Sequence, residues 1–192
     1  MKRIKITFLF LLTSLVMSCG FHLRGAEDLS AVIPSVQLRG IMKHDVLTHN
    51  LTEALSQAKV NVLDDAKFVL DVKSTGFRKR VLSIDSAGRA NQYELNYQLS
   101  FALLEKIEDG KLEAEKSSQT RPIRFVEVIP VQTITEKREY LFDSNIILAK
   151  ADEENRLKAD MRQAALLQLI RRLTFSLKAK QHGSVQMPGT EK

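Results

Sequence analysis

The chain has 192 residues, of which 27% are charged and 6% aromatic, and its formal net charge is +6. The first 18 residues carry three positive charges and no negative one, so the remaining 174 residues have a net charge of +3. That length allows one domain with a real core, while the mixed charge and the absence of Trp argue against nucleic-acid binding. The small positive excess still suits an anionic partner such as a phosphorylated lipid head group.

A secretory signal opens the chain. Basic residues lie within the first five positions, and the mostly apolar run over 6–16 is shorter than the ~20 residues that span a bilayer. Cys19, the only cysteine, follows the small residue Ser18 directly. It is either a free thiol at the boundary or the lipid-modified cysteine of a lipoprotein, and the shape of the signal favours the second reading.

We therefore expect residues 1–18 to be cleaved and Cys19 to carry diacylglyceryl and N-acyl groups, because two or more acyl chains hold a protein stably at a membrane. Gly20 stands where an acidic inner-membrane retention signal would stand in bacterial lipoproteins. By that analogy, the expected location is the periplasmic side of the outer membrane.

The first folded elements are predicted over residues 36–63. The stretch 36–39 indicates a short strand closed by Gly40, and Asp45 is a suitable N-cap for the next element. A stripe of apolar residues then recurs at helical spacing and predicts an amphipathic helix over 46–58: Leu47, Leu51, Ala54, Leu55 and Ala58. The following residues, 60–63, indicate a brief extended exit.

The hydrophobic period then changes to two. Residues 68–84 predict a strand in which Gly76 marks a bulge or bend, and 85–88 predict a turn. The clearest strand covers 93–103, with one apolar face: Tyr93, Leu95, Tyr97, Leu99, Phe101 and Leu103. The polar residues between them, Glu94, Asn96, Gln98 and Ser100, predict an opposite face that meets water or a polar partner surface.

Two further elements complete the chain. Asp109-Gly110 predicts a hairpin, and residues 131–142 predict a last extended segment after the interrupting Pro122 and Pro130. The final helix is predicted by acidic residues at 152–154 and basic ones at 171–172, which match the helix macrodipole at its two ends. Its apolar stripe includes Leu157, Met161, Ala165, Leu169 and Leu173.

The order β-α-β-β-β-α predicts an α+β fold, a two-layer sandwich in which a four-stranded, mainly antiparallel sheet carries two helices on one face. One domain over residues 19–177 is expected, anchored at Cys19 and followed by a flexible polar tail over 178–192.

No catalytic, metal or cofactor site is predicted, because the four histidines are scattered and no nucleophile motif or phosphate-binding loop occurs. Four basic residues, Arg78, Arg80, Arg89 and Lys150, are candidates for binding phosphate groups. The alternative is that they are solvated charges at strand ends and turns. Arg78, Lys79 and Arg80 alternate along a strand and cannot all point the same way.

The motif Cys19-Gly20-Phe21-His22-Leu23-Arg24-Gly25 resembles the start of the mature lipopolysaccharide-assembly lipoproteins of the LptE family, where lipidated Cys-Gly precedes an aromatic residue and His-Leu-Arg. Residues 140–145 and 148–154 resemble that family's link into its last helix, and Gln168-Leu169-Ile170-Arg171-Arg172-Leu173 resembles the end of that helix. The chain departs from the family pattern in a longer stretch from Lys116 to Pro130.

The resemblance implies a protein without catalysis that plugs and helps assemble the LptD-type β-barrel of the outer membrane and assists delivery of lipopolysaccharide to the outer leaflet. It also implies contact with lipopolysaccharide before the last helix, where Lys150 has the matching Leu-Ala-Lys context, and near the turn that Arg89 follows. The alternative function is a free lipopolysaccharide- or lipid-binding lipoprotein of the outer membrane without a barrel partner.

Overall fold

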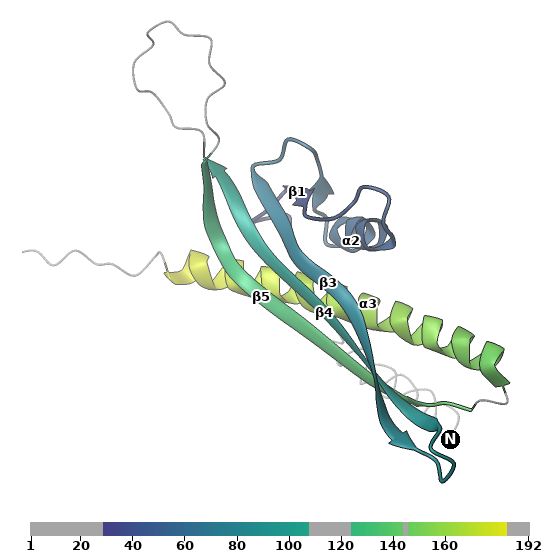
Figure 1. Cartoon of the computed structure of the whole chain (residues 1–192). Helices are drawn as coiled ribbons and strands as arrows, with labels where there is room; N and C mark the ends of the chain where they lie inside the picture. Colours follow the sequence, from purple (N-terminus) through teal and green to yellow (C-terminus); the bar gives the residue numbers. More distant parts are fainter. Residues whose placement is uncertain (1–28, 108–123, 144–145, 184–192) are drawn as a thin grey trace, which may run out of the picture.

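The computed structural model describes residues 29–107, 124–143 and 146–183. Three long strands form a twisted ribbon, with a long helix along one side and a smaller helical unit near one end (Figure 1). The elements are β1 (Ser35–Arg39), α2 (Val46–Gln57), β2 (Asn61–Val62), β3 (Phe68–Ile84), β4 (Ala90–Ile107), β5 (Arg124–Leu141) and α3 (Ile147–Gly183). No helix in these ranges is both long enough and apolar enough to cross a membrane.

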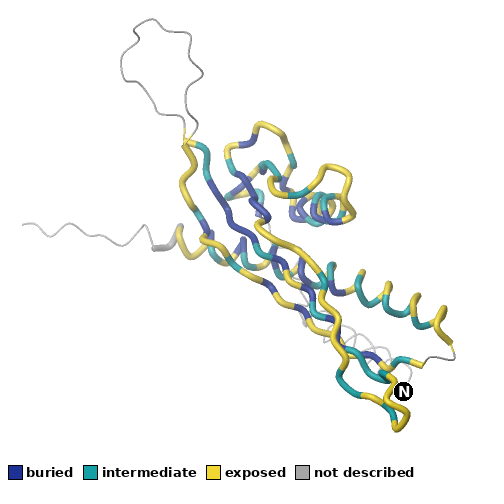
Figure 2. The backbone as a smooth tube through the Cα atoms, viewed as in Figure 1, coloured by how far each residue is buried: buried dark blue, intermediate teal, exposed yellow. Residues whose placement is uncertain are grey.

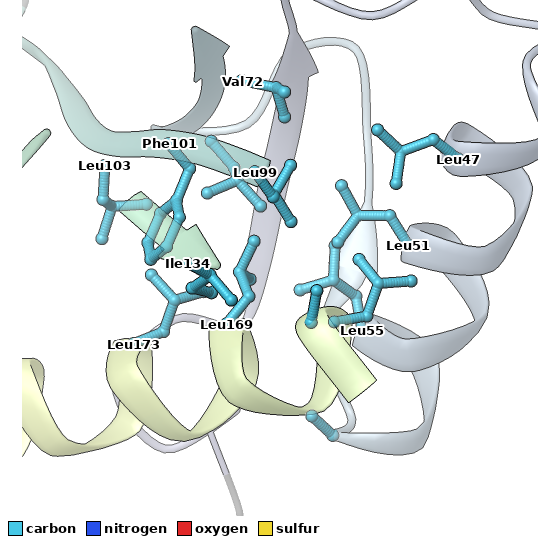
Figure 3. Packing of buried hydrophobic residues seen from close by; sticks show 14 of the residues in the cluster. Leu47, Leu51, Leu55, Val72, Leu99, Phe101, Leu103, Ile134, Leu169 and Leu173 are labelled. Carbon is cyan, nitrogen blue, oxygen red and sulfur yellow. The ribbon is translucent and has the colours of Figure 1, made fainter. Parts of the chain in front are cut away.

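The core forms on one face of the sheet, because β4 alternates as its sequence predicts. Leu95, Leu99 and Phe101 are fully buried, and fully burying such a side chain stabilises the fold by ~1.5–3 kcal/mol. They belong to the same buried cluster as Leu51 and Leu55 of α2 and Met161, Leu169 and Leu173 of α3 (Figure 3). Both helices therefore cover the same face of the sheet, and the α+β class is confirmed.

The sheet differs from the prediction in having five strands, in the order β2-β1-β3-β4-β5. The segment expected only as an extended exit becomes β2, which pairs in parallel with β1 through Ser35↔Asn61 and Val36↔Val62. Because β1 also runs parallel to β3, while β3, β4 and β5 are antiparallel, the sheet is mixed. A strand of only two residues is too short to show an alternation of apolar and polar side chains, so the local sequence could not reveal β2.

Other features of the predicted elements also differ from the observed ones. α3 begins at Ile147, so Asp152–Glu154 do not lie in its first turn, and it continues to Gly183 past the predicted start of the polar tail. Asp45 occupies the N-cap of α2 but its side chain makes no capping hydrogen bond. β3 is irregular between Val72 and Ser74 and again between Val81 and Ile84, whereas Gly76, where the bulge or bend was predicted, pairs regularly with Gln98. The predicted hairpin at Asp109-Gly110 lies outside the described residues.

β5 is an edge strand that starts at Arg124, earlier than expected. A shift in its register with β4 accommodates Pro130 within the strand.

The register of β5 also shows which of its backbone groups point outward. Phe142 N donates to Asn91 O (2.8 Å) in the register that pairs Tyr93 with Tyr140. Since hydrogen-bonded and non-hydrogen-bonded pairs alternate in an antiparallel ladder, the backbone groups of residues 133, 135, 137 and 139 point away from β4. Two arginines, Arg172 and Arg138, donate to the outward carbonyls of Thr133 (3.0 Å) and Lys137 (2.8 Å).

The end of β1 approaches β3 at a glycine. Gly40 has φ +85°, and a Cβ there would lie 2.1 Å from the backbone oxygen of Val72. Beside it, the buried carboxylate of Asp71 binds Arg39 and Lys73, each at 2.6 Å. The hydrogen bond from Arg39 lowers the pKa of Asp71. Because a Cβ at position 40 would collide with the backbone of Val72, the end of β1 requires glycine there.

We expect Gly40→Ala to lower the free energy of unfolding by at least about 2 kcal/mol, because it combines a left-handed backbone with a clash against a backbone oxygen. Urea unfolding of the purified chain measures the loss. Gly76→Ala is the control, since nothing lies within 4 Å of a Cβ at that position. Equal stability of the two variants would contradict the described approach of β1 to β3.

Candidate interaction surface

The β3–β4 hairpin ends in a turn that holds Arg89. Asp85 accepts hydrogen bonds through Oδ1 from the backbone N–H groups of Ala87 and Arg89, both at 2.9 Å, and through Oδ2 from Arg89 Nε at 3.0 Å. The hydrogen bond from the Arg89 backbone contributes most to lowering the pKa of Asp85. The guanidinium is thus fixed at the tip while its side chain stays 67% exposed.

Alternation along β3 separates its three adjacent cations, as predicted. Arg78 and Arg80 pair in register with Asn96 and Glu94 on the sheet face opposite the helices, which we call the open face. Arg80 donates two hydrogen bonds to Glu94, from Nε at 2.8 Å and from Nη2 at 3.2 Å. The hydrogen bond from Arg80 lowers the pKa of Glu94. Among the described residues, Arg78 has no such carboxylate partner.

Lys79 points to the other face and joins the hairpin to α3. Its Nζ lies 2.6 Å from Glu154 Oε2 and 4.1 Å from the centre of the Tyr93 ring. The rings of Tyr140 and Phe142 also lie within 6 Å of Nζ, a range in which an aromatic face attracts a cation. Lys79 therefore connects all three long strands to the first half of α3.

Glu154 is the anionic centre of this contact. Besides Lys79, it binds Lys158 Nζ at 2.6 Å and accepts a hydrogen bond from the hydroxyl of Tyr140. Partial burial alone would raise the pKa of Glu154, but the hydrogen bonds from Lys158, Lys79 and Tyr140 outweigh it and lower the pKa to about 2. The carboxylate is consequently charged throughout the neutral range.

Lys150 lies in the first turns of α3 and binds Glu153 at 2.7 Å, with its side chain 17% exposed. The hairpin tip with Arg89 and the start of α3 lie toward the same end of the molecule (Figure 1). Arg78 and Arg80 lie on the open face instead, so the four predicted cations do not form one cluster. Cys19, the predicted lipid attachment, lies outside the described residues.

Sequence reasoning placed Asn96 on the polar face but did not connect it with Arg78, and it missed Lys137. The register Arg78↔Asn96↔Lys137 crosses all three long strands and places Lys137 on the open face. Many residues along β5 and at the hairpin tip are exposed (Figure 2). Only the register between strands distant in sequence brings these residues together, so no local motif could have identified them.

The described residues contain no group of three or more His, Cys, Asp and Glu side chains that could hold a metal ion. A hollow of about 240 Å³ between α2 and α3 is lined by Asn50, Glu53, Ala54, Gln57, Ala159, Gln163, Leu166 and Leu167. This lining has neither a nucleophile nor a pair of acid and base groups.

Comparison with known proteins agrees with the fold. A family model described as LptE, lipopolysaccharide-assembly, matches residues 33–173. The LPS-assembly lipoprotein LptE of Pectobacterium atrosepticum is 26% identical over 159 residues, which cover 81% of this chain and 76% of that protein.

Two solved structures share the fold. The crystal structure of rare lipoprotein B from Shewanella oneidensis is 23% identical, with a TM-score of 0.55, and the match covers 79% of this chain and 99% of that one. The solution structure of an uncharacterized lipoprotein B from Nitrosomonas europaea is also 23% identical, with a TM-score of 0.56 and coverage of 81% and 90%.

The contact between Lys79 and Glu154 should contribute measurably to stability. We expect Glu154→Gln to lower the free energy of unfolding by about 2 kcal/mol at pH 7, since hydrogen bonds to charged groups are worth ~1.5–3 kcal/mol. A carboxylate whose pKa is lowered on folding stabilises fully above its unfolded pKa of 4.5 and loses this effect as the pH falls toward about 2. The difference between wild type and variant should shrink across that window.

Urea unfolding at pH 7, 4.5, 3 and 2 measures this difference. Glu153→Gln is the matched control, because it removes a neighbouring carboxylate that is 44% exposed in an ion pair with Lys150, and such pairs contribute ~0–1 kcal/mol. Identical pH profiles for the two variants would show that Glu154 does not hold the hairpin to α3.

Proposed function

The chain belongs to the LptE family of lipopolysaccharide-assembly proteins, and on this basis we propose that it plugs the lumen of an LptD-type outer-membrane β-barrel, helps that barrel to assemble and assists delivery of lipopolysaccharide to the outer leaflet. The role is non-catalytic. The observation that carries the proposal is the family match over residues 33–173, joined to a long sheet with a polar open face.

The shape and chemistry of the sheet support a plug. β3, β4 and β5 contain 17, 18 and 18 residues, so each is about 55–60 Å long at ~3.3 Å per residue. That length exceeds the ~30 Å hydrocarbon core of a bilayer. The lumen of an outer-membrane barrel is polar, and the open face offers hydroxyl, amide and charged groups to such a wall.

We also propose that the chain is held at the periplasmic side of the outer membrane through lipids on Cys19, after removal of residues 1–18. The lone cysteine directly after a short apolar signal supports this, and so do the lipoprotein names of the relatives. A lipid anchor would bring the domain close to a membrane-embedded partner before the two bind.

Lys150 and Arg89 are the proposed contacts with lipopolysaccharide phosphates. Both lie toward one end of the molecule, where large aliphatic side chains are also exposed: Ile84 63%, Leu141 67%, Ile147 59% and Leu148 85%. A phosphorylated lipid combines anionic and apolar groups, so cations beside exposed aliphatic residues complement it. Each cation already has a local carboxylate, which a phosphate would have to displace or share.

The plug is tested by affinity purification of the full-length chain, tagged at its C-terminus, from detergent-solubilised outer membranes. We expect one large β-barrel protein at equal stoichiometry that stays bound at high salt. Recovery of the chain alone, or with many substoichiometric lipoproteins, would overturn the plug and favour a free lipopolysaccharide-binding lipoprotein.

The lipid contacts are tested separately by Lys150→Glu combined with Arg89→Glu. We expect roughly tenfold weaker binding of purified lipopolysaccharide, about 1.4 kcal/mol, with unchanged recovery of the barrel. Lys180→Glu, which reverses an exposed cation near the other end of α3, should change neither quantity. Undiminished lipopolysaccharide binding by the double variant would remove Lys150 and Arg89 from the proposed site.

A further inference from the structure

The open face carries one row of side chains that is not satisfied within the protein. This row consists of Arg78, Asn96 and Lys137, aligned across β3, β4 and β5, and we call it the cation row. Neighbouring strands lie ~4.8 Å apart, so the backbones of Arg78 and Lys137 are separated by roughly 10 Å with Asn96 between them.

Several other polar side chains of the open face make contacts within the protein. On one side, Arg80 binds Glu94 with two hydrogen bonds, and Gln92 donates to Glu139 at 3.2 Å. On the other side, the hydroxyls of Ser100 and Thr133 lie 2.8 Å apart. These contacts make the face polar and leave its side chains ordered.

The cation row lacks such contacts. Neither Arg78 nor Lys137 forms a direct ion pair with any residue in the described ranges, although the charge of Lys137 helps to lower the pKa of the nearby Glu94. The Oδ1 atom of Asn96 is buried and accepts no hydrogen bond, and an unsatisfied buried polar atom costs ~1–3 kcal/mol. Two exposed cations without a direct ion pair therefore flank Asn96, so the row is complementary to a surface that brings an anion.

We infer that the open face docks against the polar surface of a partner protein, with a partner carboxylate seated over the cation row between Arg78 and Lys137. This inference rests on the proposed function and deepens it by naming which face of the plug meets the inner wall of the barrel. Strands of such a wall present alternate polar side chains to the lumen. A long face of three strands suits this geometry because broad contact requires no pocket.

A protein surface fits the row better than a lipid does. Within the described ranges, the exposed aliphatic side chains of the open face lie away from the cation row: Ile84 and Leu141 are near the hairpin tip, and Val131 lies beyond Thr133 in β5. Gln98 and Thr135, which adjoin the cation row, are exposed and polar. Acyl chains would therefore find no apolar contact next to Asn96, whereas side chains of a polar wall would find charge and hydrogen bonds.

The decisive variant is Asn96→Asp in the full-length, membrane-anchored chain. It places a carboxylate of the protein itself between Arg78 and Lys137, so thermal unfolding should show a chain at least as stable as wild type. The same carboxylate should repel the partner's carboxylate and lower the barrel recovered per tagged chain roughly tenfold when variant and wild type compete in the same cells.

Gln163→Glu is the matched control, since it makes the same amide-to-acid change at an exposed position of α3 on the helical side. It should recover as much barrel as wild type. Equal recovery of the barrel by Asn96→Asp would overturn the inference and leave the proposed function intact. A wild-type chain that recovers no barrel would refute the proposed function, and the inference would fall with it.

A photo-crosslinking amino acid at Gln98 or Thr135 tests the position of the contact independently. The expected product is a covalent adduct with the barrel protein, whose formation does not depend on charge. Adducts with lipopolysaccharide alone would overturn the inference and assign the cation row to lipid phosphates.

Discussion

The structure depends on burial of a long sheet from one side. Leu95, Tyr97 and Leu99 of β4 alternate toward α2 and α3, and a strand that buries every second residue must present the others to the opposite side. The polar open face thus follows from the same alternation that builds the core. The alternation of residues along β4 therefore produces both the hydrophobic core and the polar surface that we propose meets the barrel.

A sheet that extends beyond the small unit of β1, β2 and α2 also needs support along its length. α3 provides it, and Lys79 with Glu154 extends this support from the hydrophobic stripe toward the hairpin. The contact between Lys79 and Glu154 consists of an ion pair surrounded by aromatic rings, and it lies where aliphatic packing ends, as expected near an exposed tip. The hairpin tip and the start of α3 lie toward this same end of the molecule (Figure 1).

Local patterns predicted the parts of the fold that have local causes. The alternation of β4, the turn at Asp85 and the stripe of α2 each depend on neighbours in sequence, and all three are observed. The two-residue β2 and the early start of α3 have no periodic or capping signal. The contact of Lys79 with Glu154 joins residues 75 positions apart, and the cation row depends on the register of three strands, so neither could be predicted from sequence.

The most direct test of a sheet that is open at β5 is residue-resolved amide hydrogen exchange of the purified chain. Inward N–H groups at Ile134, Glu136 and Arg138 should exchange slowly because they bond to β4, while outward groups at Thr135, Lys137 and Glu139 should exchange fast. Alternating protection along β5 would support the account. Uniform protection would show that another strand covers this edge and would contradict it.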